Sequence, residues 1–132
     1  MTAVVDDARG ASEKVLTASS FDPAESLSTD EFKSAFRNLP AGVSLITADD
    51  GTRIAALTAT SVASISADPP LLLFSLSGLS SAAPVISGAD TVVVHLLTTD
   101  ELHLAKLCST SGVDRFADTG RWTRLPTGEP VF

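Results

Sequence analysis

The sequence predicts a mainly β, antiparallel fold that closes on itself as a barrel, with short flanking helices. Short apolar segments rich in β-branched residues alternate with turn residues such as Gly, Pro and Asp. Strands that follow each other along the chain are joined by short turns, as in antiparallel sheets, and not by the long crossovers of a doubly wound α/β fold. The 132 residues suit one domain, and 44% hydrophobic content supplies a core.

The chain divides into a tail and a folded domain. Residues 1–27 are small, polar and acidic without sustained periodicity, so we expect a disordered acidic tail there. Ser28 begins a capping box that ends at Glu31, and apolar residues at helical spacing follow up to Pro40. The folded domain is therefore expected to span residues 28–132 and to begin with a helix.

Alternating and continuous apolar segments predict the strands. The first two strands form a hairpin whose turn is Asp49-Asp50-Gly51, because Asp-Gly tolerates positive φ. Residues 61–66 continue extended up to the rigid break at Asp68-Pro69-Pro70. The strongly apolar strand that follows this break, Leu71–Ser77, is expected to be central and buried. The predicted strands are Gly42–Ala48, Arg53–Thr60, Leu71–Ser77 and Thr91–Leu97.

Two further helices are expected. A short one should occupy Ser80–Ser87, beginning near the Ser80-Ser81 pair and ending at Gly88. A second capping box, Thr98–Glu101, precedes a helix whose apolar side carries Leu104, Leu107 and Cys108. After Gly112 the sequence predicts irregular structure.

Composition excludes several classes of function. The net charge is −7, and the nine Lys and Arg residues are scattered, so no basic surface for nucleic acid or an anionic membrane is expected. The longest apolar run, Leu71–Phe74, is too short to span a bilayer. The single cysteine suits a reducing compartment, and without a signal peptide we expect a cytoplasmic protein.

No motif predicts acid–base, nucleophilic or metal chemistry, so no catalytic residue is assigned. The sequence lacks a G-x-S-x-G elbow, a P-loop and a G-x-G-x-x-G fingerprint. The two histidines, His95 and His103, have no cysteine partner at zinc spacing. His95 is interpreted as a core or cavity-lining histidine, and Cys108 as a buried packing residue.

A dense band of small hydroxyl residues surrounds the double proline. Small side chains let a ligand approach the main chain, and hydroxyl and N–H groups suit a phosphate and a polar ring edge. The same pattern is also typical of the solvated face of a β-sandwich, so spacing alone leaves both interpretations open. The band consists of Thr58, Thr60, Ser61, Ser64, Ser66, Ser75, Ser77, Ser80 and Ser81.

From about Phe32 onward the chain resembles the short flavin reductases that supply reduced flavin to two-component monooxygenases. Several stretches carry the resemblance in the same order as in that family, and the block around the double proline is the most telling. The stretches are Phe36–Val43, Leu57–Val62, Ser64–Leu71, Val94–Leu97, Asp114–Ala117 and Thr127–Val131.

The resemblance implies an FMN-binding split β-barrel of antiparallel, Greek-key type that works as a homodimer. It implies reduction of FMN, or of FAD, by NADH or NADPH, and transfer of the reduced flavin by diffusion to a partner monooxygenase. The ring would meet the main chain of Leu57 and Thr58 and the side chains of Thr60 and Ser61. The opposite wall would be Ser75 and Ser77, and the phosphate would lie at Ser80 and Ser81.

The sequence departs from the family at four places. Ala56 stands where the family usually has Gly, and Ala82 replaces a phosphate-binding Ser or Thr. Leu107-Cys108 replace an Arg-Phe pair, which removes a cation that could meet the phosphate. The family also continues beyond the position of Phe132 with closing strands and a nicotinamide-binding turn. The barrel is therefore expected to be incomplete at the C-terminus. An inactive flavin-binding module, or a purely structural one, is the alternative function.

Overall fold

A computed structural model describes residues 2–6, 30 and 41–132. The first of its two units combines Met1–Asp7 with Gly42–Phe132 and contains every strand and helix named below. The second unit is Ala8–Ala41. The predicted helix that begins at the Ser28 capping box lies outside the described residues except for Asp30, which is helical.

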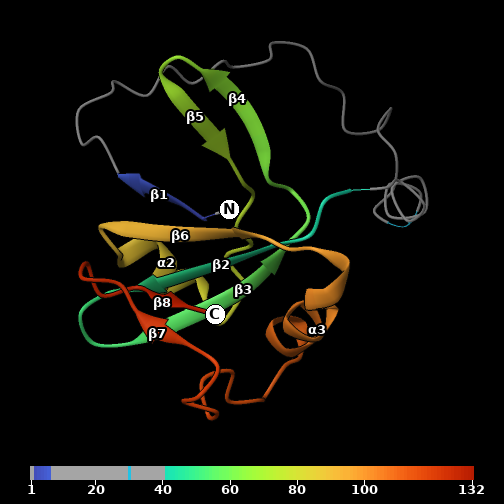
Figure 1. Cartoon of the computed structure of the whole chain (residues 1–132), viewed down its shortest axis with the longest axis vertical. Coiled ribbons are helices and arrows are strands. Elements are labelled where there is room, and N and C mark those ends of the chain that lie inside the picture. The colour runs from blue at the N-terminus through green and yellow to red at the C-terminus, as the bar shows by residue number, and fades with distance from the viewer. Residues whose placement is uncertain (1, 7–29, 31–40) are drawn as a thin grey trace. The chain divides into compact units, whose positions relative to one another are not determined.

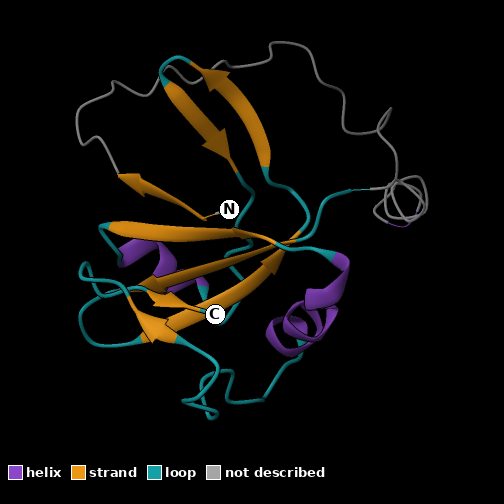
Figure 2. Cartoon of the chain, in the orientation of Figure 1, coloured by secondary structure: helices purple, strands orange, loops and turns teal. Residues whose placement is uncertain are grey.

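Strands predominate over helices, which confirms the predicted mainly β, antiparallel class (Figure 1; Figure 2). In chain order the elements are β1 (Thr2–Asp6), β2 (Ser44–Asp49), β3 (Ile54–Ala59), β4 (Ala63–Ala67), β5 (Pro70–Leu73), α2 (Ala83–Gly88), β6 (Thr91–Leu96), the 3₁₀ helix η2 (Thr99–Glu101), α3 (Leu102–Ser109), β7 (Thr123–Arg124) and β8 (Pro130–Val131).

The main sheet has the strand order β1-β6-β2-β3, and all its ladders are antiparallel. β2 and β3 form the predicted hairpin. In its turn Gly51 adopts a φ of +84°, which other residues disfavour. The carboxylate of Asp50 accepts the main-chain N–H groups of Thr52 and Arg53 at 2.9 and 2.7 Å. These bonds rigidify the turn that the Asp-Gly pair predicted.

Strand β1 lies within the expected tail of residues 1–27. It pairs with β6 from Thr2, opposite His95, to Asp6, opposite Thr91. These five residues therefore differ from the expected disorder, because a neighbouring strand supplies hydrogen bonds that local periodicity does not reveal. The rest of the tail lies outside the described residues, and the boundary at residue 27 remains a prediction.

Both faces of the main sheet are covered, because successive side chains of a strand point to opposite faces. One face packs against Val85 and Ile86 of α2, and the other against Cys108 of α3 and the rings of Phe116 and Phe132. Leu104 and Cys108 are buried, which confirms the predicted apolar side of α3. The sheet residues on the α2 face are Ile46, Ala48, Ala55, Ala59, Val92 and Val94, and those on the α3 face include Leu45 and Ala56.

Helix α2 begins three residues later than predicted. Ala82 is its N-cap and Pro84 lies in its first turn, where the fixed φ of proline is favourable. The carbonyl of Ser80 accepts the N–H of Ala83 at 3.0 Å, so Ser80 and Ser81 form a turn before the helix and do not cap it. Gly88 ends the helix as predicted.

Strands β4 and β5 form a separate two-stranded sheet, the β4–β5 ribbon (Ala63–Leu73), drawn as its own pair of arrows in Figure 1. The turn between them contains a cis peptide bond at Asp68-Pro69. The prediction that Leu71–Ser77 is a central buried strand is wrong, because β5 ends at Leu73, and Leu71 and Leu73 are 52% and 49% exposed. An apolar run indicates a strand but does not select the sheet that the strand joins.

The segment after Gly112 is more ordered than predicted. β7 and β8 pair, with Thr123 opposite Val131. The hydroxyl of Thr47 donates to the carbonyl of Pro130 at 2.5 Å. Glu129 is fully buried and accepts hydrogen bonds from the hydroxyls of Thr91 and Thr127. Contacts with distant strands therefore order a segment whose own sequence contains no regular pattern.

Candidate functional site

Strand β3 lies at an edge of the main sheet. In an antiparallel ladder, residue pairs that bond to each other alternate with pairs whose main-chain N–H and C=O groups point outward. The hydrogen bond from the N–H of Asp50 to the carbonyl of Arg53 (3.1 Å) shows that Asp50 and Arg53 are a bonded pair of the β2–β3 ladder. From this pair onward, the main-chain groups of Ile54, Ala56 and Thr58 point away from β2. Within the described part of the chain, no hydrogen bond reaches these groups. At the half-buried Ile54 and Thr58, the edge therefore offers free N–H and C=O groups.

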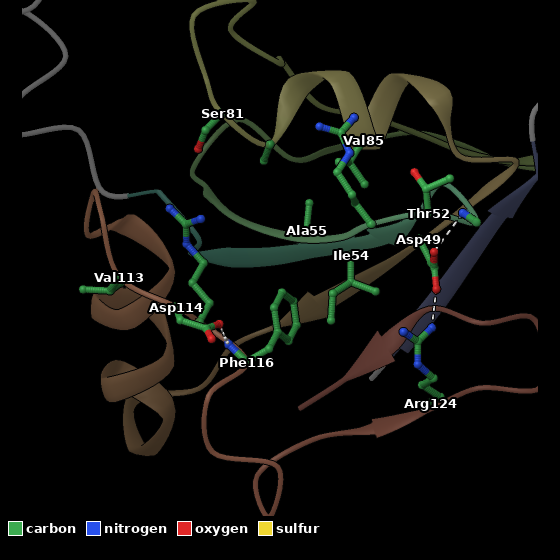
Figure 3. A pocket seen from close by; sticks show the side chains of 14 residues that line it. Asp49, Thr52, Ile54, Ala55, Ser81, Val85, Val113, Asp114, Phe116 and Arg124 are labelled. Atoms are coloured by element: carbon green, nitrogen blue, oxygen red, sulfur yellow. Dashed lines mark hydrogen bonds and ion pairs between the residues drawn. The ribbon is translucent and has the colours of Figure 1, made fainter.

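A cleft of about 670 Å³ opens beside Ile54 and Ala55 of β3. Figure 3 shows Ser81 and Val85 on one side of these strand residues, and Asp114 and Phe116, from the loop after α3, on the other. The volume lies within the range of about 300–1,000 Å³ that is typical of small-molecule sites. The cleft combines an apolar floor with hydroxyl and charged groups at its walls.

Three arginines line the cleft: Arg53, Arg115 and Arg124. Arg124 is paired with Asp49 (Figure 3), and the hydrogen bond between them is the largest cause that holds the pKa of Asp49 below its ordinary value. Arg53 lies 3.3 Å from the carboxylate of Asp50. Hydrogen bonds, the largest from the hydroxyl of Thr52, lower the pKa of Asp50 to about 2. Both arginines therefore already face an ionised carboxylate.

Arg115 differs from the other two arginines. Its Nε donates to the carbonyl of Cys108 and its Nη2 to the carbonyl of Thr110, each at 3.2 Å, where α3 ends. No carboxylate in the described ranges forms an ion pair with it. The two neutral carbonyls orient the guanidinium without cancelling its charge. Arg115 is therefore the cation of the cleft best able to meet an anionic ligand.

Phe116 presents an aromatic ring to the same cleft. The ring stacks on Phe132 with centroids 5.5 Å apart and makes an edge contact with Trp122 at 5.3 Å. The N–H of Phe116 donates to Asp114 at 2.9 Å. These contacts fix the ring in place, so it can serve as a rigid apolar surface for a planar ligand.

The structure brings only part of the predicted site to the cleft. Ser81 lines it. Thr58 offers outward main-chain groups at the edge of β3, while its hydroxyl donates to the carbonyl of Ala105 at 2.8 Å. The main chain of Leu57 points at β2, opposite Ile46, and its side chain packs toward α2. Of the two residues expected to offer main-chain groups to a ring, only Thr58 is therefore free to do so.

The remaining predicted residues lie next to the two ends of the β4–β5 ribbon (Thr60, Ser61 and Ser75) or in the turn before α2 (Ser77 and Ser80). The hydroxyl of Ser61 accepts the N–H of Ser75 at 2.9 Å, which ties the two ends of the ribbon together. Thr60 is exposed. The hydroxyl of Ser77 accepts the N–H of Leu79, and that of Ser80 accepts the N–H of Ala82, each at 3.3 Å. None of these five lines the 670 Å³ cleft.

Sequence reasoning missed the cationic and aromatic part of the cleft. Arg115 and Phe116 belong to a stretch that was matched to the family without a role for either residue. Arg53 and Arg124 were not singled out, because they lie far apart in the sequence and neither belongs to a motif. Only the pairing of β7 with β8 and the hairpin turn bring these side chains to one place.

The other candidate groups have structural roles. Nδ1 of His95 is 3.1 Å from the carbonyl of Leu45, and its Nε2 accepts the N–H of Phe132 at 3.4 Å, which supports the interpretation as a core histidine. Burial raises the pKa of the Cys108 thiol to about 11, as suits a packing residue. No cluster of three or more His, Cys, Asp or Glu that could hold a metal occurs among the residues with a described structure. Among those same residues, no helix has the length and apolar character needed to cross a membrane.

Comparisons with known proteins agree with this architecture. Residues 36–132 match the model of the flavin reductase like domain. An NADH:FMN oxidoreductase of Rhodococcus erythropolis is 41% identical over 102 residues, which are 77% of this chain and 53% of the relative. The crystal structure of a flavin reductase domain protein from Arthrobacter sp. FB24 has a TM-score of 0.72 at 36% identity, over 76% of this chain and 62% of that one. Nitrilotriacetate monooxygenase component B from Mycobacterium thermoresistibile has a TM-score of 0.66 at 25% identity, over 76% and 55%.

The chain spans about half the length of the Rhodococcus relatives that it matches. Within that span the flavin reductase domain protein from Arthrobacter shares its fold, which confirms the split-barrel class expected from the resemblance. The matched region includes β2 to β8 and every residue of the cleft. The chain belongs to the flavin reductase like domain family.

Proposed function

We propose that this chain is the flavin-binding part of an FMN reductase that uses NADH and supplies reduced flavin to a partner monooxygenase. The observation that carries the proposal is the cleft at the free edge of β3, where main-chain groups, an aromatic ring and an unpaired arginine converge. Membership of the flavin reductase like domain family supports it. So does the similarity to an NADH:FMN oxidoreductase and to a monooxygenase component.

The residues of the cleft fit the chemistry of FMN. The polar edge of an isoalloxazine ring presents both hydrogen-bond donors and acceptors, and the outward N–H and C=O groups of Ile54, which lines the cleft, supply both. Phe116 offers an apolar surface to the ring, and Ser81 offers a hydroxyl to the polar tail. A bound flavin would supply the hydride acceptance, while the chain binds it and sets its orientation. The assignment of Leu57, Thr60, Ser61, Ser75, Ser77 and Ser80 as further flavin contacts remains a prediction.

Arg115 is the proposed phosphate-binding cation. The sequence lacks the helical arginine that the family usually has at the position of Leu107, and Arg115 is oriented by the carbonyls at the end of the same helix. Ser81 lines the same cleft and can donate a hydroxyl to the same group. In a chain of net charge −7, a locally uncompensated cation is needed to hold a phosphate dianion.

Titration with FMN and with riboflavin, which lacks the phosphate, tests this assignment. In the Arg115→Gln variant we expect FMN to bind at least about tenfold more weakly, because a hydrogen bond to a charged group contributes about 1.5–3 kcal/mol. Riboflavin affinity should stay unchanged, which also shows that the variant is folded. Arg53→Gln is the matched control, since Arg53 lines the cleft but already faces Asp50. Equal losses for both ligands would contradict the role of Arg115.

Addition of NADH to the FMN-loaded protein tests the activity. Loss of the visible absorbance of oxidised flavin under anaerobic conditions is the expected result, with NADPH compared in parallel. A flavin that binds but keeps its absorbance would favour the inactive flavin-binding module. A protein that binds neither FMN nor FAD would overturn the proposed function altogether.

The proposed assembly is a homodimer in the cytoplasm, and the monooxygenase receives the reduced flavin by diffusion. A diffusing product needs no permanent contact between reductase and oxygenase. Scattered basic residues and the net charge of −7 support the absence of nucleic acid and of anionic membrane surfaces among its partners.

A further inference from the structure

The segment between α3 and β7 forms one wall of the cleft without regular secondary structure. Residues 110–122, all of which the structure describes, contain no helix or strand. Asp114, Arg115 and Phe116 of this segment line the cleft (Figure 3). Their hydrogen bonds go only to this segment and to the end of α3. The position of the Phe116 ring relative to the main sheet therefore depends on side-chain packing.

Trp122 makes two contacts with Phe116. Its indole Nε1–H donates to the carbonyl of Phe116 at 3.1 Å. The two rings also meet edge to face, with centroids 5.3 Å apart and planes at 73°, which is a favourable geometry for an aromatic pair. One contact holds the main chain of Phe116 and the other holds its side chain. Together they restrict rotation of the ring away from the cleft.

Trp122 is in turn anchored to the hairpin turn through Arg124. The guanidinium of Arg124 lies 5.9 Å from the centroid of the indole ring, within the distance of about 6 Å that is typical of a cation–π contact. The same guanidinium pairs with Asp49 at the end of β2 and donates to the carbonyl of Gly128 at 2.7 Å. The indole therefore connects Phe116 to the main sheet through an arginine that is itself held in place.

Trp122 is half-buried and lies outside the cleft, whereas Phe116 and Arg124 line it. The core cluster on the α3 face of the sheet includes the rings of Phe116 and Phe132 but not that of Trp122. The ring contacts of Trp122 thus go to two residues of the cleft wall and not to the core. An aromatic side chain in this place affects a ligand only through the residues that it holds.

We infer that Trp122 is a positioning residue for flavin binding, because it fixes the Phe116 ring against which the isoalloxazine ring packs. The inference rests on the proposed function and adds a residue to the same site. Arg115 is oriented separately, by the carbonyls of Cys108 and Thr110. Loss of Trp122 should therefore weaken the binding of the flavin ring and leave the contribution of the phosphate unchanged.

Titration with FMN, riboflavin and lumiflavin, which is the ring system without the ribityl chain, tests the inference. The Trp122→Leu variant should bind all three about two- to tenfold more weakly and by the same factor, as expected for the loss of an aromatic pair. The ratio of FMN to riboflavin affinity should stay that of the wild type, in contrast to Arg115→Gln. Trp122→Phe keeps an aromatic ring and should recover part of the affinity. Unchanged binding by Trp122→Leu, or a loss confined to FMN, would overturn the inference.

Val92→Ala is the matched control for a general loss of stability. Val92 is buried in β6 on the α2 face of the sheet and does not line the cleft. Denaturant titration should show that this variant and Trp122→Leu are both less stable than the wild type but folded under the binding conditions. The flavin affinities of Val92→Ala should equal those of the wild type. If both variants lose flavin affinity equally, Trp122 has no specific role at the cleft and the inference is overturned.

The indole N–H provides a measurement that needs no flavin. Trp122 is the only tryptophan of the chain, so its indole N–H gives a single signal in the NMR spectrum. Because it is bonded to Phe116, this proton should exchange with solvent more slowly than that of free tryptophan. An equal rate would overturn the inference, since the contact would not persist in solution. A slowly exchanging indole in a wild type that binds none of the three flavins would contradict the proposed function, and with it the role in flavin binding. A wild type that binds them as well as Trp122→Leu does would contradict the inference alone.

Discussion

The main sheet and the β4–β5 ribbon are built from similar apolar strands, yet their surroundings differ completely. Ile46 of β2 is fully buried between β3, β6 and α2, whereas Leu73 of β5 is about half exposed. Strands β2 and β6 have a partner on both edges and cover on both faces, while β4 and β5 pair only with each other. The comparison shows that the apolar content of a strand does not by itself determine how deeply the strand is buried. Burial also depends on how many neighbouring strands and helices cover the strand.

Truncation of a core residue of the sheet should have the largest effect. Ile46→Ala removes buried methyl groups from the face of the main sheet that packs against α2. This change should lower the free energy of unfolding by about 2–5 kcal/mol. Leu73→Ala is the matched change in the ribbon and should cost less than about 1 kcal/mol in dilute protein. Denaturant titration of both variants measures the difference. Equal losses would show that the ribbon is as well packed in one chain as the sheet.

Removal of the buried carboxylate that links the sheet to the C-terminal segment should rank second. Glu129→Ala leaves the hydroxyls of Thr91 and Thr127 without their partner, which should cost about 1–3 kcal/mol. Asp118→Ala is the control, because its ion pair with Arg121 is exposed and should contribute almost nothing. If the two variants unfold at the same denaturant concentration, Glu129 does not anchor this segment.

The tie at the base of the ribbon should have a smaller effect. Ser61→Ala removes the acceptor of the Ser75 N–H and should cost about 0.5–1.5 kcal/mol, at the lower end because both residues are exposed to water. Amide hydrogen exchange at Ser75 should become faster, while amides of β2 keep their protection. Ser87→Ala, an exposed change at the end of α2, serves as the control. Unchanged exchange at Ser75 would mean that the ribbon is held by other contacts.

The smallest expected effect is a pH dependence of the stability that arises from His95 in the main sheet. Burial is the largest cause that lowers the pKa of His95, while its hydrogen bond to Leu45 acts in the opposite direction. The unfolded chain therefore takes up this proton first, near the ordinary value of about 6.5. The contribution of neutral His95 to the free energy of unfolding is therefore complete above that pH. It is lost as the pH falls toward the lower pKa of His95 in the folded state. The thermal midpoint should drop between pH 7.5 and pH 5.5.

Replacement of each histidine assigns that pH dependence. His95→Asn should flatten the profile over this range, and His103→Asn, on the exposed side of α3, should leave it as in the wild type. A profile that keeps its slope in the His95 variant would assign the dependence to another group.

Local chemistry made much of the main sheet predictable. The Asp-Gly pair predicted the hairpin, β-branched residues predicted β6, and the Thr98–Glu101 box predicted the start of the helical region, where the N–H of Thr98 donates to Glu101 at 2.7 Å. These features depend on contacts between residues close in sequence, so their signal is complete in a short window. The resemblance of separate stretches to flavin reductases also predicted the family.

Only the tertiary structure decided which residues line the cleft and which sheet β5 joins. Arg53, Arg115 and Arg124 meet because a hairpin turn, the end of α3 and the β7 strand converge, and no local pattern encodes that convergence. Whether Arg115 forms an ion pair depends on which carboxylates the fold places near its guanidinium. The sequence by itself determined which segments are strands and helices and which of their faces are apolar. Long-range packing determined what covers those faces, because burial is a property of the whole arrangement and not of a segment.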